Sequence, residues 1–193
     1  MVGGFGPHTI DRLRDVLPHP DEEDPDPEHR RAAAVLIPLF VRSDELRVVL
    51  TKRTDHLRSH SGEVSFPGGG REPGDATLLQ TALRETHEEI GLPPEAVDVL
   101  GSLEDLPTFG SNYLIRPYVG FIPSSIEFSR DPHEVERVLT PKLDQFTDPS
   151  VRRIEIRQRD GVEYQVHFFD VDGDNVWGAT ARMLVRLIEL IEN

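Results

Sequence analysis

The feature that most limits how this chain can fold is a glycine run followed closely by a helix with three glutamates. The run is Gly68–Gly70, and the glutamates are Glu85, Glu88 and Glu89. At about 100° per residue, Glu88 and Glu89 lie about 60° to one side and about 40° to the other side of Glu85. The three carboxylates therefore share one helix face, where like charges at these spacings repel each other.

A divalent cation would turn this repulsion into attraction. Hard oxygen ligands without clustered histidine favour Mg²⁺ or Mn²⁺ over Zn²⁺, and the chain has no cysteine. The opposite helix face would dock on a core through Leu79, Leu83, Thr86 and Ile90. The sequence thus predicts a magnesium or manganese site held by Glu85, Glu88 and Glu89.

These residues resemble the signature box of the Nudix hydrolases. RETHEEIGL, from Arg84 to Leu92, matches REUxEExGU, where U is a bulky apolar residue, apart from a threonine at the first U. The first half differs, because its acid position holds Asp75 with one inserted residue before Arg84. Asp75 is equally suited to cap the helix or to contact metal. The resemblance implies an α/β/α sandwich with a mixed β-sheet and a metal contact from the carbonyl of Gly68 or Gly69.

Residues upstream of the box resemble an additional signature of the coenzyme A pyrophosphatase branch of this family. The matching residues are Leu50, Thr51, Arg53, Thr54, Arg58, Gly62, Val64, Phe66, Pro67, Gly68 and Gly69. Further similarity occurs at residues 116–120, 133–138 and 177–182. The resemblance implies hydrolysis of coenzyme A to adenosine 3′,5′-bisphosphate and 4′-phosphopantetheine.

A basic segment just before the glycine run is a candidate for substrate contact. Its Arg53 and Arg58 could bind phosphate, because a guanidinium matches phosphate oxygens in a fixed fork. A solvated loop with internal salt bridges is the competing interpretation, but the adjacent FPGG motif favours substrate contact. The resemblance adds Phe66 and Gly68 as substrate-binding residues.

The predicted catalytic set consists of side chains on and beyond the glutamate helix. By resemblance, Arg84 orients a glutamate of the helix, although it is also spaced to form a simple ion pair with Glu88. By the same resemblance, Glu134 is the candidate for a further acid that orients water or binds a second metal. From the sequence pattern alone, it could also be an ordinary surface acid. One acid of the set would take the proton of the attacking water. The set is Arg84, Glu85, Glu88, Glu89 and Glu134.

The 193 residues fit one domain with a small N-terminal addition. Residues 1–30 read as a short helix over residues 9–17, with Thr9 as a possible N-cap, and an acidic, proline-rich, solvated connector. Residues 31–193 form the hydrolase domain. The strands expected from apolar patterning are 32–41, 46–52, 97–106, 113–122, 154–159 and 162–169, followed by a helix over 179–191.

The charge and hydropathy of the chain limit the classes of partner that it is expected to bind. A net charge of −14 argues against nucleic-acid binding, because no basic surplus is present to release counterions. No apolar run reaches the roughly 18 residues that a membrane span needs. The expected setting is the cytoplasm, with a small nucleoside diphosphate derivative as partner and homodimerisation as a possibility.

The sequence is compatible with three alternative functions. The first is coenzyme A hydrolysis, and the second is hydrolysis of ADP-ribose, a dinucleotide or a modified nucleoside triphosphate by the same site. The third is a non-catalytic binding module with the same fold. The crowded glutamates Glu85, Glu88 and Glu89 count against the third function, because a binding module has no need of such a cluster.

Overall fold

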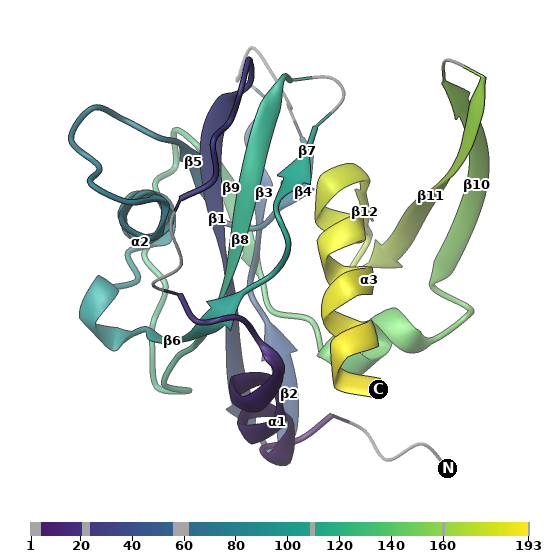
Figure 1. Cartoon of the computed structure of the whole chain (residues 1–193). Helices are drawn as coiled ribbons and strands as arrows, with labels where there is room; N and C mark the ends of the chain where they lie inside the picture. The colour runs from purple at the N-terminus through teal and green to yellow at the C-terminus, as the bar shows by residue number, and fades with distance from the viewer. Residues whose placement is uncertain (1–4, 21–23, 56–61, 109–110, 160, 193) are drawn as a thin grey trace.

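The computed structural model describes residues 5–20, 24–55, 62–108, 111–159 and 161–192. Figure 1 shows the chain from its N-terminus to its C-terminus. In chain order the elements are α1 (His8–Val16), β1 (Arg31–Arg42), β2 (Glu45–Val48), β3 (Leu50–Arg53), β4 (Val64–Ser65), β5 (Gly68–Gly70), α2 (Leu78–Ile90), the 3-10 helix η1 (Pro94–Ala96), β6 (Asp98–Ser102), β7 (Leu106–Pro107), β8 (Tyr113–Phe121), β9 (Val135–Leu139), the 3-10 helix η2 (Leu143–Thr147), β10 (Arg152–Arg159), β11 (Val162–Val171), β12 (Asp174–Trp177) and α3 (Gly178–Glu192).

The strands of the described residues form three sheets. The largest has the order β2-β1-β8-β6, with β5 added to β1 and β7 added to β8. β1 and β8 run parallel, whereas the other pairs in this sheet are antiparallel, so the predicted mixed sheet is confirmed. The two smaller sheets are β4-β3-β9 and β10-β11-β12.

β1 is buried on both faces and separates two hydrophobic cores. Ala34, Leu36 and Phe40 belong to the core beneath α2, whereas the alternate residues Val35 and Ile37 belong to the core beneath α1 and α3. This alternation follows from the two-residue period of a strand. α2 and α3 accordingly lie on opposite sides of the central sheet (Figure 1). The predicted α/β/α sandwich is confirmed.

The predicted single strand over residues 46–52 is wrong, because the chain changes sheets within it. β2 pairs with β1, whereas β3 pairs with β4 and β9. Val48, Val49 and Leu50 are buried in succession, which a single strand with one buried face does not allow. The change of sheet places Arg53, at the end of β3, beside β9.

The N-terminal helix is part of the main core. Its Ile10 and Leu13 pack in the same core as α3, and Arg12 Nε donates a hydrogen bond of 3.3 Å to Leu190 O. The helix begins at His8 after Pro7, so the prediction of Thr9 as N-cap is wrong. Thr9 lies inside the first turn and is buried. The boundary at residue 30 stays a prediction.

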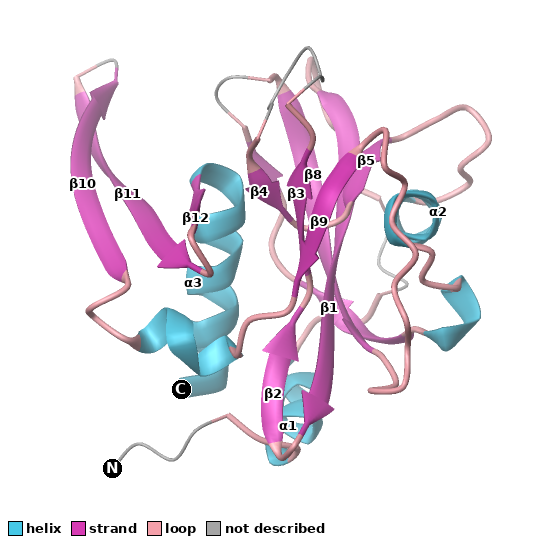
Figure 2. Ribbon diagram, turned by 180° about the vertical axis from the view of Figure 1, so that it is seen from behind, coloured by secondary structure: helices cyan, strands magenta, loops and turns pink. Residues whose placement is uncertain are grey.

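The predicted C-terminal hairpin and helix are confirmed as β10, β11 and α3. Figure 2 shows the hairpin from behind, where β10 and β11 project beyond α3. Among the helices of the described residues, none combines the length and the apolar character that crossing a membrane demands.

Candidate functional site

Helix α2 carries the predicted glutamates, and its two ends fix its position. Thr77 is the N-cap residue, and its hydroxyl accepts a hydrogen bond of 3.2 Å from Gln80 N. Of the two roles left open for Asp75, the role of N-cap is therefore wrong. At the other end Gly91 adopts a left-handed conformation (φ 68°), which ends the helix. Thr86 and Ile90 are buried, as the expected docking face requires, and Leu79 and Leu83 are partly buried.

Asp75 holds Arg84 in a two-point ion pair. Arg84 Nε donates to Asp75 Oδ1 at 2.9 Å, and Arg84 Nη2 donates to Asp75 Oδ2 at 2.9 Å. The Thr81 hydroxyl and the Glu72 amide also donate to Oδ2, at 3.0 Å and 2.9 Å. These donors keep the pKa of the Asp75 carboxyl well below its usual range, with the Arg84 hydrogen bond as the largest cause. Arg84 is thereby fixed along the helix.

Glu85 lies against the glycine run. A Cβ atom on Gly69 would come within 2.5–2.7 Å of the Glu85 carboxylate, so any side chain there would displace it. Gly68 has φ 150°, and a Cβ on it would meet Ala34 O at 2.4 Å, so the backbone itself requires glycine. Arg84 Nη1 lies 3.0 Å from Glu85 Oε1. Burial raises the pKa of Glu85 despite this cation.

Glu89 is the buried acid of the group. The residue is 3% exposed, and its Oε2 has no hydrogen-bond partner among the described residues. Burial raises the pKa of Glu89 to about 8; the charges of Glu85 and Glu134 act in the same direction, and Arg53 opposes them. Arg53 Nη1 lies 3.6 Å from Glu89 Oε1. A buried, unsatisfied carboxylate oxygen is costly unless a ligand completes it.

Glu134 reaches the same region from the loop before β9. The loop is bonded to the helix, because Asp131 N donates to Glu89 O at 2.9 Å. It is also bonded to the residue that follows β3, because Thr54 N donates to Glu134 O at 3.0 Å. Glu134 is exposed, and its charge raises the pKa of both Glu85 and Glu89. The site therefore has an exposed acid, Glu134, and a buried acid, Glu89.

Glu88 takes a different direction from the other two helix glutamates. Its side chain is 58% exposed, and Arg84 Nη1 lies 3.0 Å from its Oε2. No three acidic or histidine side chains within the described ranges are gathered closely enough to enclose a metal in this conformation. The structure thus brings Glu85 and Glu89 to the glycine run and leaves Glu88 outside, paired with Arg84.

The group still fits a divalent cation. Burial raises the pKa values of the Glu85 and Glu89 carboxyls, and the charges of nearby acids raise them further. One of their oxygens, Glu89 Oε2, lacks a partner among the residues described. A hard cation prefers such oxygen ligands and would offset both the burial and the repulsion.

Of the other residues predicted to bind substrate, Phe66 and Gly68 differ in their distance from the acid group. Arg58 lies outside the described residues. The ring of Phe66 is 1% exposed and packs in the core beneath α3, which gives it a packing role. Gly68 pairs with Val35 of β1. Its backbone amide also lies close enough to Glu89 to hydrogen-bond the carboxylate, which favours the charged form of that acid.

Sequence reasoning missed Asp24, which lies in the acidic connector. Both of its carboxylate oxygens accept from Leu78 N, at 3.1 Å and 3.2 Å, in the first turn of α2. Arg71 Nη1 lies 3.2 Å from Asp24 Oδ2. Nothing in the local sequence distinguishes this aspartate from its acidic neighbours, since its partners are about fifty residues away in the chain.

Comparisons with known proteins identify the family of this chain. The family model described as NUDIX domain matches residues 29–159. Nudix hydrolase 15, mitochondrial, from Arabidopsis thaliana is 44% identical over 176 residues, covering 86% of this chain and 61% of the plant protein. This chain thus spans less than two thirds of that relative. The uncharacterized Nudix hydrolase NudL from Yersinia pestis (strain Pestoides F) is 34% identical over 195 residues, covering 99% of this chain and 97% of the relative.

Solved structures share the fold at lower identity. The MutT/nudix family protein from Enterococcus faecalis superposes with a TM-score of 0.58 at 16% identity, covering 89% of this chain and 65% of that one. RenU, a Nudix hydrolase from M. smegmatis, gives 0.52 at 22% identity over 62% of this chain and 74% of its own. The matched family model and the nearly full-length Yersinia relative show that this chain belongs to the Nudix hydrolase family.

Proposed function

We propose that this protein hydrolyses the diphosphate bond of coenzyme A or its derivatives, with Mg²⁺ or Mn²⁺ as cofactor. The products are adenosine 3′,5′-bisphosphate and 4′-phosphopantetheine. The observation that carries the hydrolytic part is the buried oxygen of Glu89, next to Glu85 and the glycine run, that has no hydrogen-bond partner within the described ranges. The substrate part rests on the resemblance of residues 50–69 to the coenzyme A pyrophosphatase signature.

Each acid has a distinct task in this proposal. Glu85 and Glu89, with the carbonyl of Gly69, would hold the cation, and Glu88 would join them only after leaving Arg84. When bound, the cation would neutralise the diphosphate and offset the charge that develops on the leaving phosphate. Arg84, fixed by Asp75, keeps Glu85 directed at the glycine run.

Glu134 is the proposed acceptor of the proton from water. Glu134 is exposed and is close enough for its charge to raise the pKa of Glu85 and Glu89. The water oxygen adds to one phosphorus as the bridging phosphorus–oxygen bond breaks, and the water proton passes to Glu134. An exposed base can receive substrate and water together, whereas Glu89 is only 3% exposed.

Arg53 is the proposed phosphate contact. Its side chain is 24% exposed and lies beside Glu89, and its Nε has no hydrogen-bond partner among the described residues. In a chain of net charge −14, an anionic substrate needs such a local cation. Arg58, in the same segment, is proposed as a second contact.

A substrate screen tests the proposal. Coenzyme A, dephospho-coenzyme A, ADP-ribose and NADH are each incubated with the protein and Mg²⁺ or Mn²⁺, and products are identified by mass. We expect the highest kcat/KM for coenzyme A. A higher kcat/KM for ADP-ribose or NADH would overturn the substrate, whereas no hydrolysis of any compound by folded protein would overturn the enzyme assignment and favour a binding module.

Replacing Arg53 by alanine should lower kcat/KM for coenzyme A roughly tenfold to a hundredfold, because a charged hydrogen bond to phosphate contributes about 1.5–3 kcal/mol. If the contact is to the 3′-phosphate, dephospho-coenzyme A should be hardly affected by the change. Arg42→Ala is the matched control. Arg42 is the last residue of β1, whereas Gly68–Gly70 pair with Ala33–Val35 near the first residue of that strand, so Arg42 lies far from the site. Equal losses in both variants would remove Arg53 from the proposal.

A further inference from the structure

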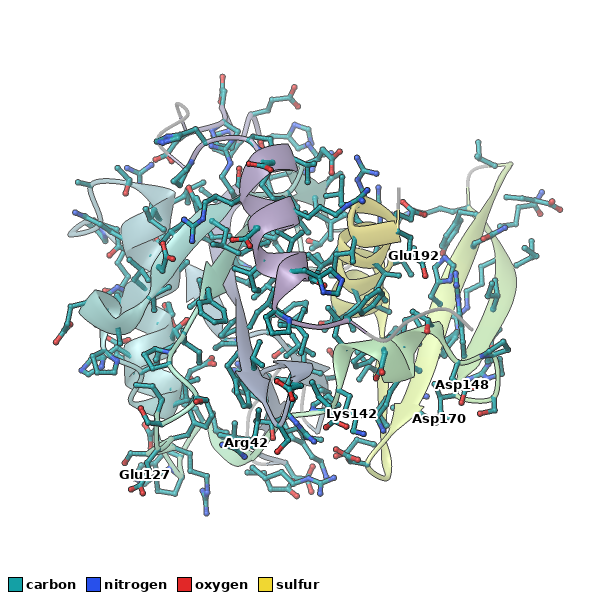
Figure 3. The ribbon with its side chains drawn as sticks, turned by 90° about the horizontal axis from the view of Figure 1, so that it is seen from below. Arg42, Glu127, Lys142, Asp148, Asp170 and Glu192 are labelled. Carbon is teal, nitrogen blue, oxygen red and sulfur yellow. The ribbon has the colours of Figure 1, made fainter. Side chains whose placement is uncertain are left out.

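Strand β10 forms a free edge of the C-terminal sheet. Its eight residues, Arg152–Arg159, pair with β11, and they pair with no other strand in the part of the chain that is described. In Figures 1 and 3 the β10–β11 hairpin stands at the side of the molecule away from α2. An exposed edge of this length presents a row of backbone donors and acceptors to a further strand.

The hairpin also exposes large apolar side chains. Ile154 and Ile156 on β10 are 46% and 61% exposed, and Val162 and Tyr164 on β11 are 67% and 37% exposed. The two isoleucines are on the same face as Phe169, which is buried in the core, so this face turns toward the body. A two-stranded ribbon with both faces in water is marginally stable by itself. The hairpin therefore gains from a partner strand.

We propose that β10 pairs antiparallel with β10 of a second copy of this chain, about a twofold axis through Ile156. The two three-stranded sheets then become one sheet of six strands. In this register Glu155 lies opposite Arg157 of the second copy, and Arg157 lies opposite Glu155, which gives two pairs of opposite charge. Ile156 of one copy then lies directly opposite Ile156 of the other copy, on the face of the sheet that turns toward the body of each molecule.

Charge argues against two neighbouring registers, and contact with the turn at residues 148–151 argues against a third. An axis through Glu155 or through Arg157 places like charges directly opposite each other, which destabilises a sheet. An axis through Ile154 also pairs Glu155 with an arginine, but it brings the partner hairpin against the turn at residues 148–151, which holds β11 through Val151 O. The register through Ile156 sets Arg153 opposite Arg159 only near the strand ends, where water screens them.

The two copies of helix α3 have room beside each other in this arrangement. α3 packs against β11 and β12 and leaves β10 overhanging. With neighbouring strands about 4.8 Å apart, the two copies of β11 are about 14 Å apart across the joined sheet. Packed helices need an axial separation of only about 8–10 Å. The two copies of α3 therefore do not collide.

The mass in solution tests the assembly. Sedimentation equilibrium from about ten to several hundred micromolar should give twice the chain mass of 21.8 kDa for the wild type and the single mass for Ile156→Lys. Val162→Lys is the matched control, because Val162 is more exposed but lies on β11. A wild type of 21.8 kDa throughout, or equal dissociation by both lysine variants, would overturn the proposal.

Disulfide formation tests the register without a disruptive change. The natural chain has no cysteine, so a single introduced cysteine reports only on its own copy. Residues opposed on the axis have Cα atoms about 4.5–5.5 Å apart, within disulfide range, so Ile156→Cys should form linked dimers on mild oxidation. Ile154→Cys should not, because its two copies are about 13 Å apart along the strands. Faster linking through residue 154 than through residue 156 would overturn the register.

Discussion

Glu89 couples the stability of the protein to cation binding. Burial of its carboxylate is unfavourable without a cation, so Glu89→Gln should raise the melting temperature of metal-free protein at neutral pH. Millimolar Mg²⁺ or Mn²⁺ should then raise the melting temperature of the wild type more than that of the variant, because ligand binding to the folded state adds RT ln(1 + [L]/Kd). Turnover of the variant should fall by orders of magnitude.

Calorimetry and steady-state kinetics measure these effects, with Glu95→Gln as the control. Glu95 is an exposed acid in η1, outside the cluster. Equal turnover in the wild type and Glu89→Gln, at matched melting temperatures, would contradict the role given to Glu89.

Asp75 should stabilise the fold in a pH-dependent way. Asp75→Asn removes the charged partner of Arg84 and should lower the free energy of unfolding by about 1.5–3 kcal/mol at pH 7. The pKa of Asp75 is lowered in the folded protein from its ordinary 3.8, so its contribution is complete above that value and is lost as the pH falls.

Urea unfolding between pH 7 and pH 3 measures this dependence. The difference between wild type and Asp75→Asn should be largest above about pH 5 and should shrink toward pH 3. Asp15→Asn, on the exposed face of α1, is the control. A constant difference across the range would mean that the Asp75 charge is not responsible.

Sequence alone left the role of Asp75 open for a physical reason. Asp75 and Thr77 are both good capping residues, and local preference does not decide between them. The choice depends on Arg84, whose side chain reaches back along the helix and occupies the carboxylate. Asp75 is thereby used in an ion pair, and Thr77 caps the helix.

At the scale of elements, strands that stay within one sheet could be predicted from the sequence. The break between two strands that belong to different sheets could not. The strands 154–159 and 162–169 could be predicted as a hairpin, because the Asp160–Gly161 dipeptide between them is a sequence that favours a tight turn. The change of sheet between β2 and β3 depends on partners β4 and β9, which lie elsewhere in the chain. Apolar runs do not reveal such a change.

Helix α2 should depend on the connector that precedes β1. Asp24→Ala removes the acceptor for Leu78 N and the partner of Arg71, so it should lower the free energy of unfolding by about 0.5–2 kcal/mol, as the loss of a helix cap does. Urea unfolding measures the loss. Asp26→Ala, two residues along the same connector, is the control, and equal effects of both changes would mean that Asp24 does not act as a cap.

At the scale of the whole molecule, the sandwich could be predicted because the motif of residues 84–92 resembles the signature box of the Nudix hydrolases, and that resemblance implies the sandwich. The packing of α1 could not, since a nine-residue amphipathic helix does not specify its partner. Leu13 of α1 lies in the same core as Leu184 of α3, so the first element of the chain and the last are joined there.

The position of β1 has a consequence for local motion. β1 bonds to β2, β5 and β8 and is buried on both faces, so its backbone amides should exchange with solvent deuterium only when the whole domain unfolds. β5 shares that ladder through Ala33–Val35, and the glycine run should exchange at the same slow rate. Cation binding should then slow exchange throughout β1, including residues on the far side of the sheet from Glu89. Protection confined to α2 would show that the helix opens independently of the sheet.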